Sequence, residues 1–183
     1  ELTMKQHHNA ERQKFAGVLM SGKITEDNYL RYLVNQYHCY NILDNHPEYT
    51  LPDDRLKRSE KIKEDIDELC RMPMVNYHSV VVLKKYISDS TTDYIEYVNN
   101  IKTKEDFMAH VYVRYLGDLR GGQMIKKKVP GSGKYYEFDE PEELANSIYR
   151  NINDEMADEA KKVFEYATKL FIEMYEELDT TQI

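Results

Sequence analysis

Residues 103–127 read TKEDFMAHVYVRYLGDLRGGQMIKK, and this stretch combines a helical pattern with residues that weaken a helix. Apolar side chains recur in it every three or four residues, which is typical of an amphipathic helix. These residues are Phe107, Val111, Tyr115, Leu116, Leu119, Met124 and Ile125. Yet three of the chain's 7 glycines, Gly117, Gly121 and Gly122, lie within the same stretch. Each glycine inside a helix costs about 1 kcal/mol relative to alanine, so the three together give up about 3 kcal/mol.

Two explanations fit this glycine cluster. Small residues at Gly117 and Gly121 let another helix approach closely, or they let a flat ligand lie against the bared backbone, and the spacing does not choose between them. Asp118 favours the ligand, because a carboxylate is a poor helix former in this turn and can face the same opening. The alternative for Asp118 is a solvated position on the outer face. Arg114 and Tyr112 are near enough along the helix to complete a polar network with it.

A second pattern lies near the N-terminus, in His7-His8-Asn9-Ala10-Glu11. His7 and Glu11 are four residues apart, so they share one face of a helix. A carboxylate there can orient the imidazole through one ring nitrogen while the other nitrogen binds a metal. The spacing does not choose between His7 and His8, and a histidine with no ligand is the alternative for both.

The rest of the sequence predicts an all-α protein with a single domain over residues 1–183. This length is ample for one core. The chain has only 7 Gly and 5 Pro, and long periodic stretches contain neither. Tyr135–Phe138 is expected to be a short extended piece between helices. Helices are predicted over 1–21, 25–46, 53–70, 75–88, 90–99, 103–127 and 141–177.

Composition excludes several classes of protein. No apolar run approaches the roughly 18–20 residues of a membrane-spanning helix, and the first residues lack the apolar core of a signal peptide. A formal net charge of −8 disfavours nucleic-acid binding, which needs clustered positive charge. Cys39 and Cys70 are too few for a disulfide scaffold and form no CxxC pair, which excludes a structural zinc site. We expect a cytoplasmic monomer, or a plastid protein whose transit peptide has been removed.

Taken together, these residues resemble the heme oxygenase family. Tyr112–Lys127 is similar to the distal-helix signature of that family, and His7-x-x-Ala10-Glu11 is similar to its proximal-ligand motif. The resemblance runs from about Thr3 to Leu178 and is weak over residues 47–100. It implies a helical bundle that holds heme between an N-terminal proximal helix and a glycine-kinked distal helix.

The resemblance implies an enzyme for which heme is both cofactor and substrate. Members of the family use O2 and electrons from an external donor to cleave a meso carbon, usually the α carbon, and they release biliverdin, CO and ferrous iron. Ferredoxin or another reductase is the expected donor, and a downstream bilin reductase is a further expected partner. Lys126–Lys128 is either a solvated helix end or a docking surface for such an acidic donor. The alternatives are a heme-binding or heme-sensing protein without turnover, and a helical interaction module without a cofactor, which the glycine cluster disfavours.

The resemblance also assigns roles to individual residues. His7 is the expected proximal iron ligand, in preference to its neighbour, and Glu11 is the partner of its imidazole. Asp118 is expected to organise distal waters beside the iron-bound oxygen species, held in place by Arg114 and Tyr40. The expected propionate contacts are Tyr112 and Arg150, and the other expected heme contacts are Gly117, Gly121, Gly122, Phe164 and Phe171.

Four positions depart from the pattern of the family. Arg120 stands where a small Ser or Ala is usual, so its guanidinium either points outward or crowds the distal pocket. Met4 and Asn146 replace basic residues, which thins the expected propionate anchoring, and Ala167 replaces a common Asn. Because propionate contacts set the rotation of the ring, these departures bear on the bilin isomer more than on turnover.

Overall fold

The structure is a computed structural model that describes residues 2–11, 13–73, 75 and 80–178, without the side chains of Glu11 and residues 80–82. The described residues are helical with no strand, so the predicted all-α class is confirmed. The α-helices are α1 Met4–Glu11, α2 Lys14–Met20, α3 Glu26–Asp44, α4 Ser59–Cys70, α5 Val80–Lys85, α6 Asp89–Asn99, α7 Lys104–Val111, α8 Gly117–Lys126, α9 Pro141–Tyr149 and α10 Ala157–Glu176. The short helical turns are η1 Asp54–Leu56, η2 Tyr112–Leu116, η3 Lys134–Tyr136 and η4 Asp154–Met156.

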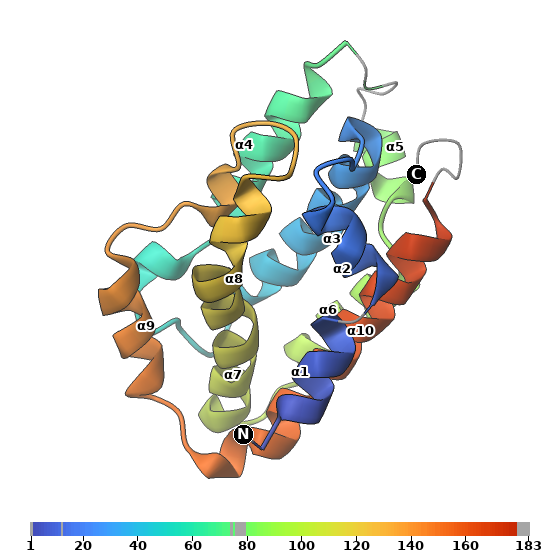
Figure 1. The fold of residues 1–183 in the computed structure, drawn as a ribbon. Helices are drawn as coiled ribbons and strands as arrows, with labels where there is room; N and C mark the ends of the chain where they lie inside the picture. The colour runs from blue at the N-terminus through green and yellow to red at the C-terminus, as the bar shows by residue number, and fades with distance from the viewer. Residues whose placement is uncertain (1, 12, 74, 76–79, 179–183) are drawn as a thin grey trace.

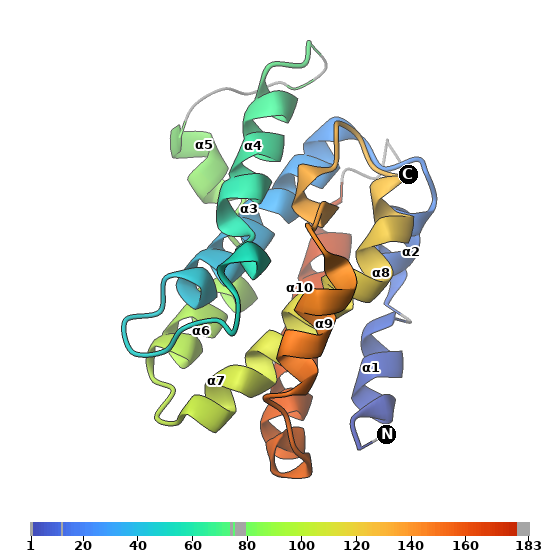
Figure 2. The same ribbon diagram turned by 90° about the vertical axis from the view of Figure 1, so that its left-hand side faces the viewer.

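The helices pack around α3 and α10, which are distant in sequence (Figures 1 and 2). α3 contacts α4 and α6, whereas α10 contacts α1, α2, α6 and α7. In Figure 1, α7 and α8 continue one another as a single rod that faces α1 and α10. The N-terminal helix therefore lies opposite the glycine-rich segment, and this arrangement positions the site.

α3 begins where the sequence predicts and is tied to α6 by one buried amide. Thr25 accepts a hydrogen bond from the backbone N–H of Asn28, which caps the first turn. The Asn35 amide nitrogen donates to the carbonyl oxygen of Tyr86 at 2.8 Å, and its oxygen accepts from the Thr91 hydroxyl at 2.7 Å. Because each polar group of this buried amide has a partner, the contact holds α3 against α6 without an unpaired donor.

Asp44, at the end of α3, connects that helix to two others. Its Oδ2 accepts hydrogen bonds from the backbone N–H groups of Arg58 at 2.9 Å and Ser59 at 2.7 Å, at the start of α4. These are N–H groups that an isolated helix leaves without partners. Its Oδ1 accepts from the Tyr115 hydroxyl at 2.6 Å. One carboxylate therefore both caps α4 and fixes the position of η2 beside α3.

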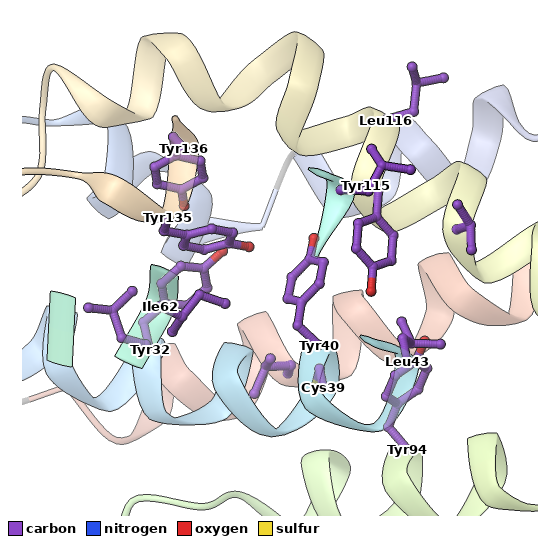
Figure 3. Packing of buried hydrophobic residues seen from close by; sticks show 14 of the residues in the cluster. Tyr32, Cys39, Tyr40, Leu43, Ile62, Tyr94, Tyr115, Leu116, Tyr135 and Tyr136 are labelled. Carbon is purple, nitrogen blue, oxygen red and sulfur yellow. The ribbon is translucent and has the colours of Figure 1, made fainter. Parts of the chain in front are cut away.

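Tyrosine side chains fill much of the core beside this contact (Figure 3). The ring of Tyr40 meets that of Tyr115 edge-on with centroids 4.9 Å apart, and it meets Tyr135 at 5.6 Å. Tyr135 and Tyr136 stack at 4.1 Å. Such rings bury a large apolar area while their hydroxyls reach polar partners. Among the described residues, no helix is both long and apolar enough to cross a membrane.

Two of the predicted helices are interrupted in the structure, and two others have different ends. The helix predicted over 1–21 is divided into α1 and α2, and the helix predicted over 141–177 is divided into α9 and α10. Asn153 causes the second break, because its side chain accepts a hydrogen bond from the backbone N–H of Glu155 at 2.9 Å and starts a new helical turn. Neither glycine nor proline marks this position. The helix predicted over 53–70 begins later, at Ser59, and the one predicted over 75–88 ends earlier, at Lys85. The start of the latter falls on residues 76–79, which with residue 74 lie outside the described residues.

The predicted extended piece at Tyr135–Phe138 is wrong in its first half, because η3 occupies Lys134–Tyr136 and the backbone becomes extended only at Glu137. Asp65 on α4 accepts the backbone N–H groups of Lys134 at 3.0 Å and Tyr135 at 2.9 Å. These contacts favour a tight helical turn, and they come from a residue far away in the sequence. The segment predicted as one helix over 103–127 contains the π-helical turn η2 between α7 and α8. A π turn shifts the register of the side chains that follow it, and such turns are frequent at functional sites.

Candidate functional site

A cavity of about 390 Å³, here called the His7 cavity, lies between α1, the η2–α8 segment and α10. α1 contributes His7 and Met4, and α10 contributes Phe164, whose ring centroid lies 5.5 Å from that of His7. The remaining lining residues are Thr3, Tyr112, Val113, Leu116, Gly117, Arg120 and Gly121. The wall is mainly apolar and contains one imidazole, so it suits an apolar ligand that carries a metal.

The three glycines of the cluster differ in what surrounds them. A Cβ atom added at Gly117 or Gly121 would meet nothing within 4 Å, so bare backbone faces open space at the cavity. A Cβ atom added at Gly122 would lie 2.3 Å from Cδ1 of Tyr136. Gly122 therefore permits close packing of η3 against α8. The resemblance implies that Gly122 contacts heme, but Gly122 does not line the cavity. The approach of another helix, which was one explanation for Gly117 and Gly121, is therefore not what the structure has at those two positions.

We expect Gly122→Ala to lower the free energy of unfolding by about 1–3 kcal/mol, because the added methyl group forces the packed Tyr136 ring to move. Gly121→Ala is the matched control. Its methyl group meets no atom within 4 Å, and alanine favours a helix over glycine by about 1 kcal/mol. That variant should unfold at the same or a higher urea concentration than the parent chain. Equal losses in both variants would contradict the packing role of Gly122.

His7 is the histidine that lines the cavity, whereas His8 does not. The two rings have their centroids 6.0 Å apart on neighbouring positions of α1. The predicted partner of His7, Glu11, has its side chain outside the described residues. Among the described residues, no group of three or more His, Cys, Asp and Glu side chains is arranged to hold a metal ion.

Asp118 follows Gly117 on α8, and its carboxylate faces the core rather than the lining of the cavity. The Tyr40 hydroxyl hydrogen-bonds to Oδ2 of Asp118 and lies 2.9 Å from the backbone carbonyl oxygen of Arg114. Burial raises the pKa of Asp118 to about 6, although hydrogen bonds from Tyr40 and Tyr135 oppose the increase. Near this pH, a protonated Asp118 can donate to Tyr40 while Tyr40 donates to the carbonyl.

Tyr135 is a partner of Asp118 that the sequence analysis missed. Gln36 donates from Nε2 to the Tyr135 hydroxyl at 2.8 Å, which leaves the hydroxyl proton of Tyr135 for Asp118. No local signal marks this residue, because it comes from η3 rather than from the helix that carries Asp118. Arg114 acts differently from the expectation. Its guanidinium lies 4.1 Å above the Tyr94 ring, and it affects Asp118 through its charge, which lowers the pKa of the carboxyl group.

The other predicted site residues are dispersed. Tyr112 lines both the His7 cavity and an adjoining cavity of about 420 Å³, here called the Asp154 cavity. Arg150 follows α9 and lines a third cavity, of about 430 Å³, together with Lys104. Phe171 does not line the His7 cavity; its ring packs against that of Phe15 with centroids 5.9 Å apart.

Comparison with known proteins gives the family of the chain. The family model for heme oxygenase matches residues 1–177. The heme oxygenase of Guillardia theta is 29% identical over 203 residues, which covers 100% of this chain and 85% of the relative. The heme oxygenase 1 of Synechocystis is 26% identical over 205 residues, covering 95% of this chain and 82% of that protein.

Solved structures give the same result for the fold. The crystal structure of heme oxygenase-1 from Synechocystis in complex with heme superimposes with a TM-score of 0.80 at 25% identity, covering 99% of this chain and 92% of that one. The heme oxygenase of Leptospira interrogans superimposes with a TM-score of 0.78 at 26% identity, covering 94% and 96%. Sequence and fold therefore agree over nearly the whole chain, and the chain belongs to the heme oxygenase family.

Proposed function

We propose that this protein is a catalytically active heme oxygenase, which uses O2 and external electrons to convert heme to biliverdin, CO and ferrous iron. One observation carries the proposal. His7 and the bare backbone of Gly117 and Gly121 line the same cavity, and Asp118, the residue after Gly117, is hydrogen-bonded to Tyr40. A flat macrocycle with a metal at its centre fits between an imidazole and a helix surface that lacks side chains.

The residues of the cavity suit heme, whose iron, when bound, supplies the position at which O2 is reduced. His7 would ligate that iron from α1, and the ring of Phe164 would keep the imidazole from turning. Leu116 and Val113 make part of the wall apolar and would exclude bulk water from the site. Glycines in α8 would let that helix move to admit the substrate and release the product.

Asp118 would control protons on the distal side. Its raised pKa, about 6, allows the carboxyl group to hold or release a proton near neutral pH. The Tyr40 hydroxyl fixes the orientation of Oδ2. The contact of Asp44 with Tyr115 joins α3, which carries Tyr40, to η2, which leads into the helix that carries Asp118. Because its carboxylate faces the core and does not line the cavity, Asp118 would act on the cavity through water molecules and would supply protons without a strong acid placed next to the iron.

The proposed electron donor is an acidic protein such as ferredoxin, docking near Lys126–Lys128. Lys127 and Lys128 are exposed, whereas Lys126 is already paired with Glu137 at 2.9 Å. The two exposed lysines support the proposal.

The rate of electron transfer from ferredoxin should fall steeply with increasing salt and after Lys127→Glu, whereas the rate with an uncharged chemical reductant should be insensitive to both. Indifference of the ferredoxin reaction to salt and charge reversal would contradict this docking site.

A heme turnover assay tests the function itself. The protein is titrated with hemin, reduced without O2, and then exposed to O2 with a reductant present. We expect a Soret band on titration, followed by its loss and by the appearance of bilin absorbance, with the product identified by chromatography. A Soret band that persists under O2 and reductant would instead support a heme-binding or heme-sensing protein. Absence of any Soret band would contradict both functions.

A further inference from the structure

The charged residues around the His7 cavity are distributed unevenly. Among the described residues that line it, Arg120 is the one lysine or arginine. The adjoining Asp154 cavity, which shares Thr3 and Tyr112 with it, has Asp154 as its one charged residue among the described lining residues. A ligand that occupies this groove therefore meets positive charge at Arg120 and negative charge at the other end.

Heme carries two propionate carboxylates, so this distribution bears on how the ring is rotated. A carboxylate placed in the Asp154 cavity would be repelled, because like charges in a partly enclosed site destabilise one another. Arg150 and Lys104 line the cavity beyond it, which meets the Asp154 cavity at Ile152, Asn153 and Met156. A guanidinium binds a carboxylate with two parallel hydrogen bonds, which fixes direction as well as position.

Arg120 has two present partners on α9, Glu142 and Tyr149, and the ion pair with Glu142 can be exchanged for a ligand. Nη1 of Arg120 lies 2.8 Å from Oε1 of Glu142 on α9, and the two side chains are 48% and 77% exposed. An ion pair with such exposure contributes little free energy because water competes for both groups. Arg120 also precedes Gly121, where the absent side chain leaves space for the ligand beside the guanidinium.

We propose that Arg120 binds a propionate carboxylate of heme, exchanging it for Glu142, and thereby sets the rotation of the ring in the His7 cavity. This inference rests on the proposed function. It makes Arg120 a specificity-determining residue of this chain. The bilin isomer should then depend on Arg120 rather than on Arg150.

Equilibrium binding of two porphyrins tests the proposal. Hemin carries both carboxylates, and hemin dimethyl ester has both blocked, so the difference between them reports carboxylate binding. Arg120→Gln should weaken hemin binding about three- to tenfold, to a Kd near that of the ester, and leave ester binding unchanged. Glu142→Gln should tighten hemin binding about two- to fivefold, because it removes the competing carboxylate.

Arg55→Gln is the matched control, because Arg55 also pairs with the first turn of α9, through Glu143 at 3.0 Å, but lines none of the three cavities. It should change neither affinity. Proton NMR of the ring methyl groups in the hemin complex gives a second readout, and their shift pattern should change in Arg120→Gln and stay the same in Arg55→Gln.

Three results would overturn the inference. If Arg120→Gln and Glu142→Gln both weaken hemin binding, the Arg120–Glu142 ion pair stabilises the packing of α8 against α9 and is not exchanged for a propionate. If Arg120→Gln weakens the ester as much as hemin, its effect is not on carboxylates. If Arg150→Gln alone abolishes the difference between hemin and ester, the propionates lie toward the far cavity. In each case hemin still binds the parent chain and turns over, so the proposed function survives; a parent chain that binds neither porphyrin would overturn both.

Discussion

Replacement of His7 by alanine is expected to abolish axial ligation of heme iron while leaving the helical fold intact. Loss of groups that merely support a metal ligand costs about 10–100-fold in affinity, so loss of the ligand itself should cost about 100-fold or more. His7 is half-buried at the edge of a cavity, and its ring contacts Phe164 without being enclosed in the core. The unfolding midpoint should therefore change little. Hemin titration followed at the Soret band, together with urea unfolding of the apoprotein, measures both effects.

Two controls separate ligation from packing. His8→Ala changes the neighbouring histidine, which does not line the cavity, and it should bind hemin as the parent chain does. Added imidazole should restore the Soret band in His7→Ala, because the small ring can occupy the space vacated by the side chain. If His8→Ala loses ligation while His7→Ala retains it, the register assigned to α1 is wrong.

Replacement of Asp118 by asparagine is expected to have opposite effects on catalysis and on stability. A positioned acid or base contributes about 10²–10⁴-fold to the rate of a proton-dependent step, so bilin formation should fall by about 10²-fold or more. Hemin binding should persist, because His7 is unchanged. The expected observation is loss of the Soret band under turnover without the corresponding bilin.

Asp118→Asn should raise the free energy of unfolding of the apoprotein, but only at pH values above about 4. The pKa of Asp118 is raised from 3.8 to about 6 by burial, so the folded state holds the proton more tightly than the unfolded chain does. Wild-type stability therefore falls as the pH rises from about 4 to about 6, and the loss remains complete at higher pH. Asparagine lacks this titration, so the variant should gain about 1–3 kcal/mol over the wild type above pH 6.

Urea unfolding of the two apoproteins between pH 4 and pH 8 measures this difference. The stability gained by Asp118→Asn should grow as the pH rises from 3.8, the ordinary pKa of the carboxyl group, to about 6, its pKa in the folded protein. Below this range the two proteins should be equally stable. Tyr40→Phe serves as a companion variant, because it removes a hydrogen bond that lowers the pKa of Asp118 and should move the upper end of this range to higher pH. A constant difference between Asp118→Asn and the wild type at every pH would show that burial does not perturb this carboxyl group.

The helical class of the fold was predictable because periodic apolar residues and the scarcity of Gly and Pro are local properties of the chain. The family was predictable from two short motifs, around His7 and over Tyr112–Lys127, and both comparisons confirm it. The ends of the helices were harder to predict from the sequence. The break at Asn153 depends on a side-chain cap rather than on a helix breaker, and η3 depends on Asp65, which lies far away in the sequence.

The sequence by itself determined that a glycine-rich helix and an N-terminal histidine pair exist, because spacing and residue type are written in it directly. Only the tertiary structure decided which members of those groups face the cavity: Gly117 and Gly121 border open space while Gly122 packs on Tyr136, and His7 lines the wall while His8 does not. It also decided that Arg120 lies between the cavity and Glu142. These outcomes depend on which helices pack together and in what register. Contacts between segments that are distant in sequence cannot be predicted from the local periodicity of apolar residues.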